Sequence, residues 1–374
     1  MSKISVYDNF NEMPAEYLKV FADASLASGF FYSYHWFNHL VNTTFEKNVF
    51  LKLYVVESHK GQAASTLALA MCHQSSSNKR LSPNKLIPVA NYYTSLFGLA
   101  KNSDSNNFEE CIKLLAHQIA GERPRWDMVD LHPLDVSSPS FTLLKNAFRK
   151  ERMAVQPYFC FGNWYLEIKG RTFKEYFDTL PARLKNTISR KTKLLNSNTN
   201  WHIKIVTSTA ELAEDISTFE TIYNSSWKNP EPHPDFIPGL IRICAMQGWL
   251  RLGIAYIDNQ PAAAQIWIVN NGVASIYKLA YIDTYSKYSI GSILTARLME
   301  HVIETDKVRE VDYLTGDDDD DYKKDWMSHR RERWGLICFN LFTLSGILAS
   351  IVHLGRSAIK RLLSPTAKQT SPQA

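Results

Sequence analysis

The sequence predicts an α+β fold made of two similar units. Each half contains apolar runs separated by short polar turns, followed by an amphipathic helical segment and a short strand. A repeated order of elements is typical of a duplicated unit. With 374 residues, the chain is also long enough for two ordinary hydrophobic cores. We therefore expect two mixed, mostly antiparallel sheets flanked by helices, in an N-terminal unit (1–168), a C-terminal unit (169–343) and an amphipathic helix with a flexible tail (344–374).

In the first half, residues 49–58 (VFLKLYVVES) and 64–74 (ASTLALAMCHQ) are apolar runs that flank the turn HKGQ. Short runs of this kind, bounded by turn residues, predict strands. Residues 90–99 (ANYYTSLFGL) are expected to be a further extended segment. Residues 107–120 show the spacing of an amphipathic helix, and residues 126–131 (WDMVDL) predict a final strand.

In the second half, residues 249–283 contain three apolar runs, and Asn271-Gly272 joins the last two. Asn-Gly between such runs predicts a tight hairpin, because both central residues must take positive φ. We therefore expect a three-stranded antiparallel meander. Residues 289–304 carry the buried stripe of a helix, and residues 309–314 (REVDYL) predict the strand that follows it.

Composition limits the partners and the location of the protein. The net charge of +5 is modest and the basic residues are clustered, which indicates local anion sites, so we expect no DNA partner. The five cysteines are far apart and show no metal-ligand spacing, which predicts reduced, buried thiols. Residues 1–18 lack the pattern of an export signal, so we expect a cytoplasmic protein.

Residues 335–355 contain no charged side chain and are long enough to cross a bilayer. Several polar residues dilute this segment, and Gly346 divides it into an expected strand and an expected helix. The helix over 344–363 has apolar residues near one face and basic residues elsewhere. Such a helix either docks on the protein or makes a peripheral contact with an anionic membrane at its inner face. Both interpretations stay open at this stage.

Gly291 and Ser292 lie at the expected start of the helix over 289–304. A glycine lets a ligand approach the backbone closely, and Ser292 is expected to cap the helix. Exposed N–H groups at a helix N-terminus form an anion site that suits a diphosphate. The alternative is an ordinary capped helix start.

Basic residues accumulate in residues 172–198, which predict one or two helices with a break at Pro181. Arg183, Lys185 and Arg190 belong to this cluster, and no acidic residue lies among them. Positive charge beside a cleft attracts phosphates when no carboxylate neutralises it. A substrate-anchoring role and a solvated helix face both remain consistent with the pattern.

Residues 315–335 (TGDDDDDYKKDWMSHRRERWG) place five aspartates next to lysines and arginines. A calcium loop needs alternate oxygen ligands, a glycine and a distant glutamate, so we expect no metal here. The preceding strand delivers Asp317 and Asp318, and a carboxylate at a strand end can act as a base toward an amine. In the following pair, Tyr322 and Lys323, the lysine can stabilise a developing negative charge. The remaining aspartates are interpreted as solvated.

The order of these motifs resembles that of a known family. The VDYL strand, the Gly-Asp-Asp step with its Tyr-Lys and Trp, the YIDTYSKYSIGSIL step and the RLKNTISRK helix are together similar to the CelD-like acetyltransferases of the GNAT superfamily. These proteins are relatives of the Fem-type peptidyl transferases of cell-wall synthesis. The resemblance covers roughly residues 170–340, and the first half matches only in its order of elements.

The resemblance implies roles for particular residues. GNAT proteins bind acyl-CoA where two neighbouring strands splay apart, with the diphosphate at the next helix start, which corresponds to Gly291 and Ser292. Fem-like relatives place an aromatic-Lys pair near the reacting acyl group, which corresponds to Tyr322 and Lys323. Their basic helix contacts substrate phosphates. The corresponding basic-helix positions in this chain are Lys185, Asn186, Arg183 and Arg190.

These motifs and the resemblance predict an N-acyltransferase that uses acetyl-CoA or another acyl-CoA and no metal. Its acceptor would be an amine on a sugar, a lipid-linked sugar or a peptide in polysaccharide or envelope synthesis. Asp317 or Asp318 would take the proton, and Lys323 would stabilise the oxyanion. Two alternatives remain. One is a Fem-type transferase that uses aminoacyl-tRNA, and the other is a non-catalytic scaffold of an envelope-synthesis complex.

Overall fold

The computed structural model describes residues 2–58, 65–74, 83–102, 107–316 and 321–363. The strands of the first half are β1 (Ser2–Tyr7), β2 (Val49–Ser58), β3 (Ser65–Gln74), β4 (Lys85–Pro88), β5 (Ala100–Lys101), β6 (Met128–Asp135) and β7 (Met153–Glu167). Its helices are α1 (Ala15–Ser28), α2 (Tyr34–Thr44), α3 (Phe108–Gly121) and α4 (Pro139–Lys150), with the 3-10 turns η1 (Phe10–Glu12) and η2 (Phe30–Tyr32).

The second half begins with two helices, as its sequence predicts. Its helices are α5 (Phe173–Thr179), α6 (Ala182–Asn198), α7 (Leu212–Asn224), α8 (Phe236–Met246), α9 (Ile290–Glu304), α10 (Asp321–Trp326) and α11 (Leu344–Leu363), with the 3-10 turn η3 (Asp283–Tyr288). Its strands are β8 (Trp201–Val206), β9 (Leu250–Ile257), β10 (Gln260–Asn270), β11 (Val273–Tyr281), β12 (Glu310–Asp312) and β13 (His329–Asn340).

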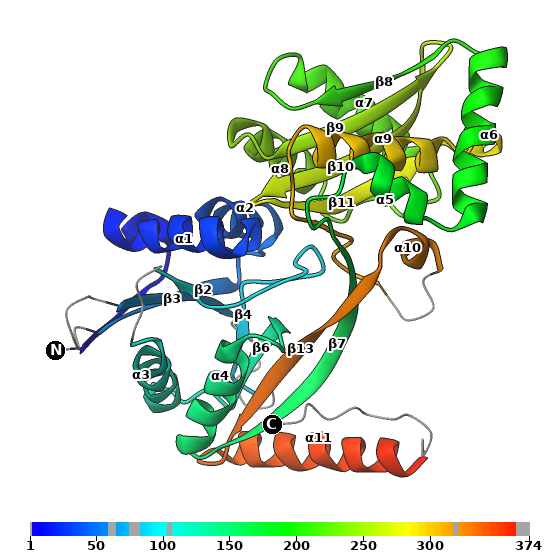
Figure 1. Cartoon of the computed structure of the whole chain (residues 1–374). Helices are drawn as coiled ribbons and strands as arrows, with labels where there is room; N and C mark the ends of the chain where they lie inside the picture. The colour runs from blue at the N-terminus through cyan, green and yellow to red at the C-terminus, as the bar shows by residue number, and fades with distance from the viewer. Residues whose placement is uncertain (1, 59–64, 75–82, 103–106, 317–320, 364–374) are drawn as a thin grey trace.

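The described strands form one mixed sheet of 13 strands. Their order is β1-β2-β3-β4-β6-β13-β7-β12-β11-β10-β9-β8, and β5 pairs with β3. Figure 1 shows the two halves as separate clusters of strands and helices, joined by the long ribbon of β7 and β13. The predicted α+β class is confirmed, and the two expected sheets are parts of one continuous sheet.

The predicted meander of the second half is confirmed. β9, β10 and β11 pair in antiparallel register. Asp258 and Asn259 have φ of 52° and 63° between the first two strands, and Asn271 and Gly272 have φ of 49° and 67° between the last two. Two consecutive residues of positive φ form the tight turn whose twist matches that of the flanking strands.

Residues 90–99 are not the extended segment that the sequence predicts. The side-chain oxygen of Asn91 accepts a hydrogen bond from the N–H of Tyr93 at 3.0 Å, and its carbonyl accepts one from Thr94 at 2.8 Å. These bonds hold a turn instead of a strand. Tyr93 and Phe97 are nevertheless buried. The run is therefore apolar because it fills the interior of the first half.

β13 belongs to the second half of the sequence but completes the first half of the sheet. It pairs antiparallel with β7 from His329 opposite Tyr165 to Asn340 opposite Met153, and with β6 on its other side. The far end of β7 pairs in turn with β12. The expected unit 169–343 thus includes a strand whose partners lie in residues 1–168, and the domain boundaries stay a prediction.

Helices cover both faces of the sheet in the second half. Alternate residues of β10 contribute to two hydrophobic clusters: Ile266 packs with α7 and α8, whereas Trp267 packs with α9 and α6. Helix α8 faces the first half, where its Phe236 stacks on Tyr93 with ring centroids 3.8 Å apart. The same residue's carbonyl lies 2.7 Å from His39 Nε2 of α2. The two halves therefore share one apolar interface.

The expected strand and helix within residues 335–355 are confirmed as β13 and α11. One side of α11 touches β13, where His353 lies 5.4 Å from the ring of Phe339 and Ser350 is buried. Its other side exposes Leu344, Leu348, Ile351 and Val352. Among the described residues, no helix is long and apolar enough to span a bilayer.

Candidate functional site

The candidate site lies where two parallel strands separate. β11 and β12 pair only over Val273–Ser275 and Glu310–Asp312. β11 then continues to Tyr281, while the chain after β12 follows β7, because the N–H of Tyr313 donates to the carbonyl of Trp164 at 2.9 Å. Each strand is thus held by a different neighbour, and the gap between them widens.

At the separated end of β11, beside η3 and the start of α9, lies a pocket of about 350 Å³, within the size range of small-molecule sites. The pocket brings Gly291 and Ser292, from the start of α9, together with Tyr322 of α10. The sequence predicts these three residues as members of one site from separate motifs. Its other lining residues are mostly apolar or hydroxyl-bearing: Trp227, Gln265, Leu279, Ala280, Tyr281, Ser286, Ser289 and Ile290.

Helix α9 directs its first turn at the pocket. It begins at Ile290, so Ser289 occupies the N-cap position with φ 50° and makes no side-chain capping bond. Ser292 lies inside the first turn, where its N–H donates to the carbonyl of Ser289 at 3.0 Å. The expectation that Ser292 caps the helix is wrong, because η3 leads the chain into the helix earlier. The first N–H groups, at Ile290 and Gly291, lack an intrahelical acceptor and favour a bound anion.

A buried polar network holds the tyrosine of the pocket. Gln265 donates from Nε2 to Thr295 Oγ1 at 2.8 Å and to the carbonyl of Gly291 at 3.0 Å. Its Oε1 accepts from Trp267 Nε1 at 2.9 Å. The hydroxyl of Tyr322 lies 3.4 Å from Thr295 Oγ1. The network therefore connects the start of α9 to the Tyr322 hydroxyl, which is a suitable proton donor at the pocket.

Gln265 and Thr295 belong to none of the sequence motifs. Both are fully buried, and each stands alone as a polar residue in an apolar element, Gln265 within AAAQIWI and Thr295 on the buried stripe of α9. A lone polar residue on a buried face needs a hydrogen-bond partner, which is the signal that indicates such a network.

Lys323 and Lys324 point to different neighbours. Lys323 donates to the carbonyl of Thr315, and its Nζ lies 5.6 Å from the ring centroid of Tyr313, beside the gap. Lys324 Nζ lies 5.9 Å from the ring of Trp164 on β7. The predicted bases Asp317 and Asp318 lie outside the described residues.

A positive cluster that the sequence analysis did not identify lies beside the pocket. Lys228, next to the pocket residue Trp227, is half-buried and shows no carboxylate within ion-pair distance among the described residues. Burial, and then the positive charges of Lys278 and Lys323, lower the pKa of Lys228. These lysines form a positive patch beside the pocket, in which Lys278 is paired with Glu231.

One of these lysines is tied to the first half of the chain through Glu231. The carboxylate of Glu231 accepts hydrogen bonds from Lys278 and Tyr223 at 2.5 Å each, from Tyr93 at 2.7 Å and from Tyr92 at 2.8 Å. Burial acts to raise the pKa of Glu231, but these hydrogen bonds lower it overall. Tyr92 and Tyr93 come from residues 90–99, so Glu231 joins the two halves next to the pocket.

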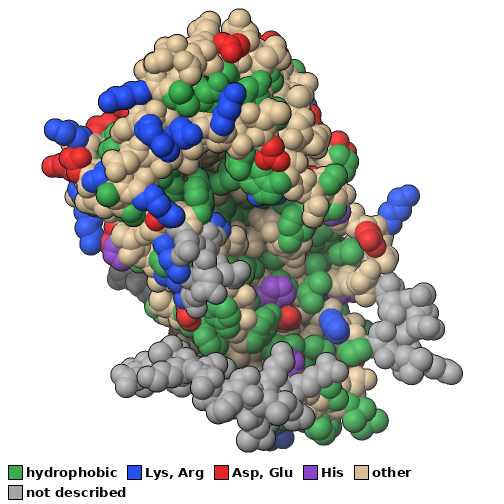
Figure 2. All heavy atoms as spheres, turned by 90° about the vertical axis from the view of Figure 1, so that its right-hand side faces the viewer, with side chains coloured by type: hydrophobic (Ala, Val, Ile, Leu, Met, Phe, Trp, Pro, Cys, Tyr) green, Lys and Arg blue, Asp and Glu red, His purple; other side chains and the backbone are tan. Residues whose placement is uncertain are grey.

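The predicted basic residues of α6 do not line the pocket. Arg183 pairs with Asp325 of α10 at 2.8 Å, and Lys185 donates to the carbonyl of Asp178 at 2.6 Å. Asn186 and Arg190 are exposed on the outer side. α6 instead contacts η3, which forms the rim of the pocket. Figure 2 shows Lys and Arg side chains around a hollow on this face, and the role of the four residues stays a prediction.

Comparison with known proteins identifies part of the chain. Residues 182–324 match the family described as the acetyltransferase (GNAT) domain. The structure of FemX is similar with a TM-score of 0.63 and 9% identity, covering 93% of this chain and 99% of that chain. The structure of L-PGS from Bacillus licheniformis is similar with a TM-score of 0.50 and 11% identity, covering 90% of this chain and 96% of that chain. No curated protein matches the sequence.

The family match covers the whole pocket. The matched residues contain α6, the meander, the splayed strands, α9 and Tyr322, so they include the whole pocket. Residues 182–324 are therefore similar to a GNAT acetyltransferase domain, and this match supports an acyltransferase. The narrower relation to CelD-like acetyltransferases stays a prediction. Among the described residues, no group of His, Cys, Asp and Glu side chains is placed to hold a metal ion.

Proposed function

We propose that the protein transfers an acyl group from acyl-CoA to a primary amine. The observation that carries this proposal is the pocket at the end of β11, which joins the start of α9 to Tyr322. Its apolar and hydroxyl-bearing lining suits the pantetheine arm, and the first N–H groups of α9 suit the diphosphate. Acetyl-CoA is the simplest donor that meets these requirements.

The reaction forms a C–N bond and breaks a C–S bond. The amine attacks the thioester carbonyl, the carbonyl oxygen takes up negative charge, and the CoA sulfur leaves as a thiolate. Tyr322 donates a proton to this thiolate, and the network through Thr295 and Gln265 keeps its hydroxyl in place. Lys323 stabilises the oxyanion, and Asp317 or Asp318 takes the proton that the amine loses.

The acceptor is an amine on a molecule that also carries negative charge. Lys278 and Lys323 lie close enough to Lys228 for their charges to lower its pKa, and Lys228 has no carboxylate within ion-pair distance among the described residues. An amine next to a phosphate would meet this cluster directly. We therefore favour a lipid-linked sugar over a free sugar or a peptide, in polysaccharide or envelope synthesis.

The exposed apolar side of α11 supports a place at a membrane. Leu344, Leu348, Ile351 and Val352 are between 52% and 82% exposed, which is unusual for four large apolar residues on one helix. Burial of such a face in the headgroup region is typical of a peripheral membrane helix. This contact would bring a lipid-linked acceptor close to the protein.

Calorimetric titration with acetyl-CoA, followed by a thiol-release assay, tests the proposal. We expect 1:1 binding at micromolar concentration, and thiol release only when an amine acceptor is added. Acceptors should be compared with and without a phosphate group, and a matched pair differing only in the amine serves as the control. Binding without thiol release from any amine would contradict the acyl-transfer mechanism.

A Fem-type transferase that uses aminoacyl-tRNA is the second candidate. The observation that favours it is the likeness to FemX, which extends over 93% of this chain and thus over both halves. The same titration separates the two candidates. No acetyl-CoA binding, together with aminoacyl transfer from charged tRNA, would select the second one, and no activity with either donor would select the scaffold.

A further inference from the structure

A second pocket, of about 310 Å³, lies between the two halves of the chain. It is bordered by the end of α1, by η2, and by parts of β11, β12 and β13. These parts lie away from the first pocket, at the start of α9, which we call the acyl pocket. Ser275 lines this pocket and Leu279 lines the acyl pocket, about 13 Å apart at 3.3 Å per strand residue. Ser275 and Leu279 point to opposite faces of β11, because the register between β10 and β11 shifts between them. Ser275 pairs with Ile268 and Leu279 pairs with Gln265, and these partners are three positions apart in β10. The pockets are therefore separate.

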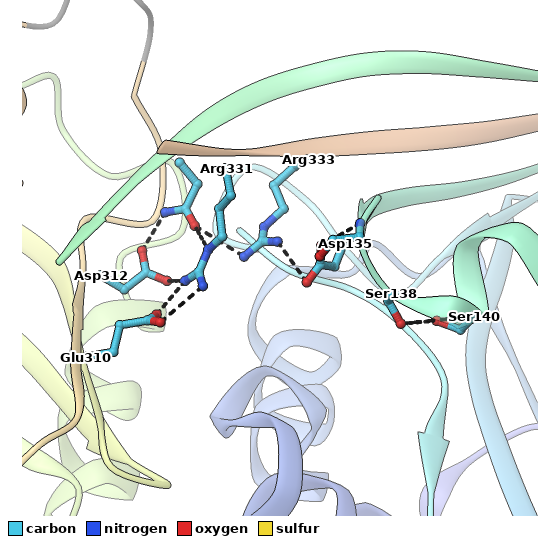
Figure 3. Close-up of polar contacts among 9 residues, drawn as sticks. Asp135, Ser138, Ser140, Glu310, Asp312, Arg331 and Arg333 are labelled. Carbon is cyan, nitrogen blue, oxygen red and sulfur yellow. Dashed lines mark hydrogen bonds and ion pairs between the residues drawn. The ribbon is translucent and has the colours of Figure 1, made fainter. Parts of the chain in front are cut away.

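Arg331 is fully occupied by partners within the protein. Its guanidinium donates to Glu310 at 2.7 Å, to Asp312 at 2.6 Å and to the side-chain oxygen of Asn163 at 2.5 Å. Figure 3 shows this guanidinium between the two carboxylates, with Arg333 beside it and directed toward Asp135. Arg331 thus contributes to the wall of the pocket and offers little to a ligand.

Arg333 has hydrogen-bonding capacity that the described residues do not use. Arg333 is 3% exposed and lines the pocket. Nη2 donates to Asn163 at 3.2 Å, and Nη1 lies 3.5 Å from the carboxylate of Asp135. Within the part of the chain that the structure describes, neither Nε nor Nη1 has a hydrogen-bond partner. A buried donor of a charged group without an acceptor is costly, and such a group calls for an acceptor from elsewhere.

An acceptor atom of the same pocket is also unsatisfied. Asn270 is 7% exposed, and its side-chain oxygen has no hydrogen-bond partner among the described residues, although its amide nitrogen lies 3.5 Å from Ser25 Oγ. A ligand that satisfies this pocket must therefore present an acceptor to Arg333 and a donor to Asn270. A hydroxyl group does both, whereas a carboxylate or phosphate supplies acceptors only.

Charge balance decides against an anion. The charged residues that line the pocket are Arg309, Arg331, Arg333, Asp135, Glu310 and Asp312. The three arginines and three carboxylates cancel, so a buried anion would add a charge that nothing neutralises. An uncharged ligand needs no such compensation. Phe30 and Phe31 add an aromatic wall for the C–H face of a ring.

We propose that this pocket binds an uncharged, hydroxyl-rich ligand the size of a single sugar ring. Arg333 donates to its ring or hydroxyl oxygens, and Asn270 accepts from one of its hydroxyls. The ligand can be a free monosaccharide or the terminal residue of a glycan, because both present the same hydroxyls. The site is independent of acyl transfer, since its ligand does not reach the acyl pocket.

Ligand-detected saturation-transfer NMR on the full chain tests the proposal. The probes are glucose, galactose, mannose, N-acetylglucosamine and the disaccharide of each, with acetate and inorganic phosphate as charged controls. We expect at least one neutral sugar to bind, and acetyl-CoA to leave its signal unchanged. Binding of a disaccharide through one ring only identifies a glycan end as the source, and loss of binding in the disaccharides identifies a free monosaccharide.

Variants locate the binding. Ser28→Trp should block the mouth of the pocket and abolish the sugar signal, since Ser28 is exposed and its replacement leaves the buried network intact. Leu26→Trp is the matched control, because Leu26 is 71% exposed and does not line the pocket. Arg333→Lys keeps the charge but removes the Nε donor, and should weaken binding roughly tenfold.

Three results would overturn the proposal. One is the absence of binding by every neutral sugar at millimolar concentration. Another is binding that survives Ser28→Trp or that acetyl-CoA displaces, which would place the sugar in another pocket. The third is binding of acetate or phosphate that Ser28→Trp abolishes while the sugars do not bind, which would identify an anion site.

Discussion

Replacing Glu231 with Gln should destabilise the junction between the two halves. The carboxylate accepts four hydrogen bonds, from Lys278, Tyr223, Tyr93 and Tyr92. Gln keeps one oxygen acceptor, turns an amide donor toward the remaining donors and leaves the Lys278 ammonium, only 19% exposed, without a counter-charge. Breaking one partner of a buried pair costs roughly 3 kcal/mol or more.

The assay is urea unfolding at pH 7, combined with a double-mutant cycle. A loss of roughly 3 kcal/mol corresponds to a melting temperature lower by roughly 4 °C in a chain of this size. Lys278→Met is the second single variant. The double variant should be more stable than Glu231→Gln alone, since it no longer leaves a buried unpaired ammonium. Additive free energies in the cycle would refute the assigned pairing.

The same pair predicts a pH dependence with a definite sign. The folded protein lowers the pKa of Glu231 below its unfolded value, which is about 4.3 for a glutamate. The ionised carboxylate therefore contributes stability above the unfolded pKa, and this contribution is lost as the pH falls through the lower folded pKa. The stability difference between the native protein and Glu231→Gln should shrink below about pH 4. A difference that stays constant down to pH 3 would contradict this assignment.

Four further outcomes test the acyl pocket and α11. Gly291→Val should weaken acetyl-CoA binding in calorimetry without unfolding the protein. The added Cβ would lie 3.4 Å from a ring carbon of Tyr281, and the rest of the side chain would enter the pocket. Unchanged affinity would show that this helix start does not belong to the site. Tyr322→Phe should lower kcat roughly 100-fold in the thiol-release assay and leave the Kd for acetyl-CoA unchanged, as loss of a general acid does. Lys323→Ala should also lower kcat roughly 100-fold, whereas the matched control Lys324→Ala should leave it unchanged. Equal kcat values for the two variants would exclude Lys323 from oxyanion stabilisation. Truncation after Leu344 should abolish sedimentation with anionic vesicles; retention of vesicle binding would exclude α11 as the contact.

Sequence periodicity and turn chemistry were sufficient to predict the local elements of this protein. The meander, α9 and the division of residues 335–355 into β13 and α11 depend on neighbours within a few positions. Asn271-Gly272 specifies its hairpin because only a few residue types adopt two consecutive positive φ values. The prediction of an extended segment at residues 90–99 was wrong because it relied on composition. A buried loop and a buried strand can have the same apolar composition.

The candidate site could be predicted only in part. Gly291, Ser292 and Tyr322 come from motifs that the sequence displays, and the pocket joins them. Gln265 and Thr295 are single polar residues whose partners lie 30 positions apart, so no local pattern connects them. The cluster of Lys228, with its lowered pKa, likewise forms only when distant segments meet.

Tertiary structure alone decided how the two halves become one molecule. The pairing of β13 with β6 and β7 places Arg333 beside Asp135, nearly two hundred positions earlier in the chain, and next to the second pocket. Alternation along β13 predicts which residues share a face, but it does not predict which strand lies alongside. That choice depends on burial summed over the whole sheet, and a sequence pattern reports only what each segment prefers by itself. The local elements were therefore determined by the sequence, whereas the partners of its buried charges were determined by the fold.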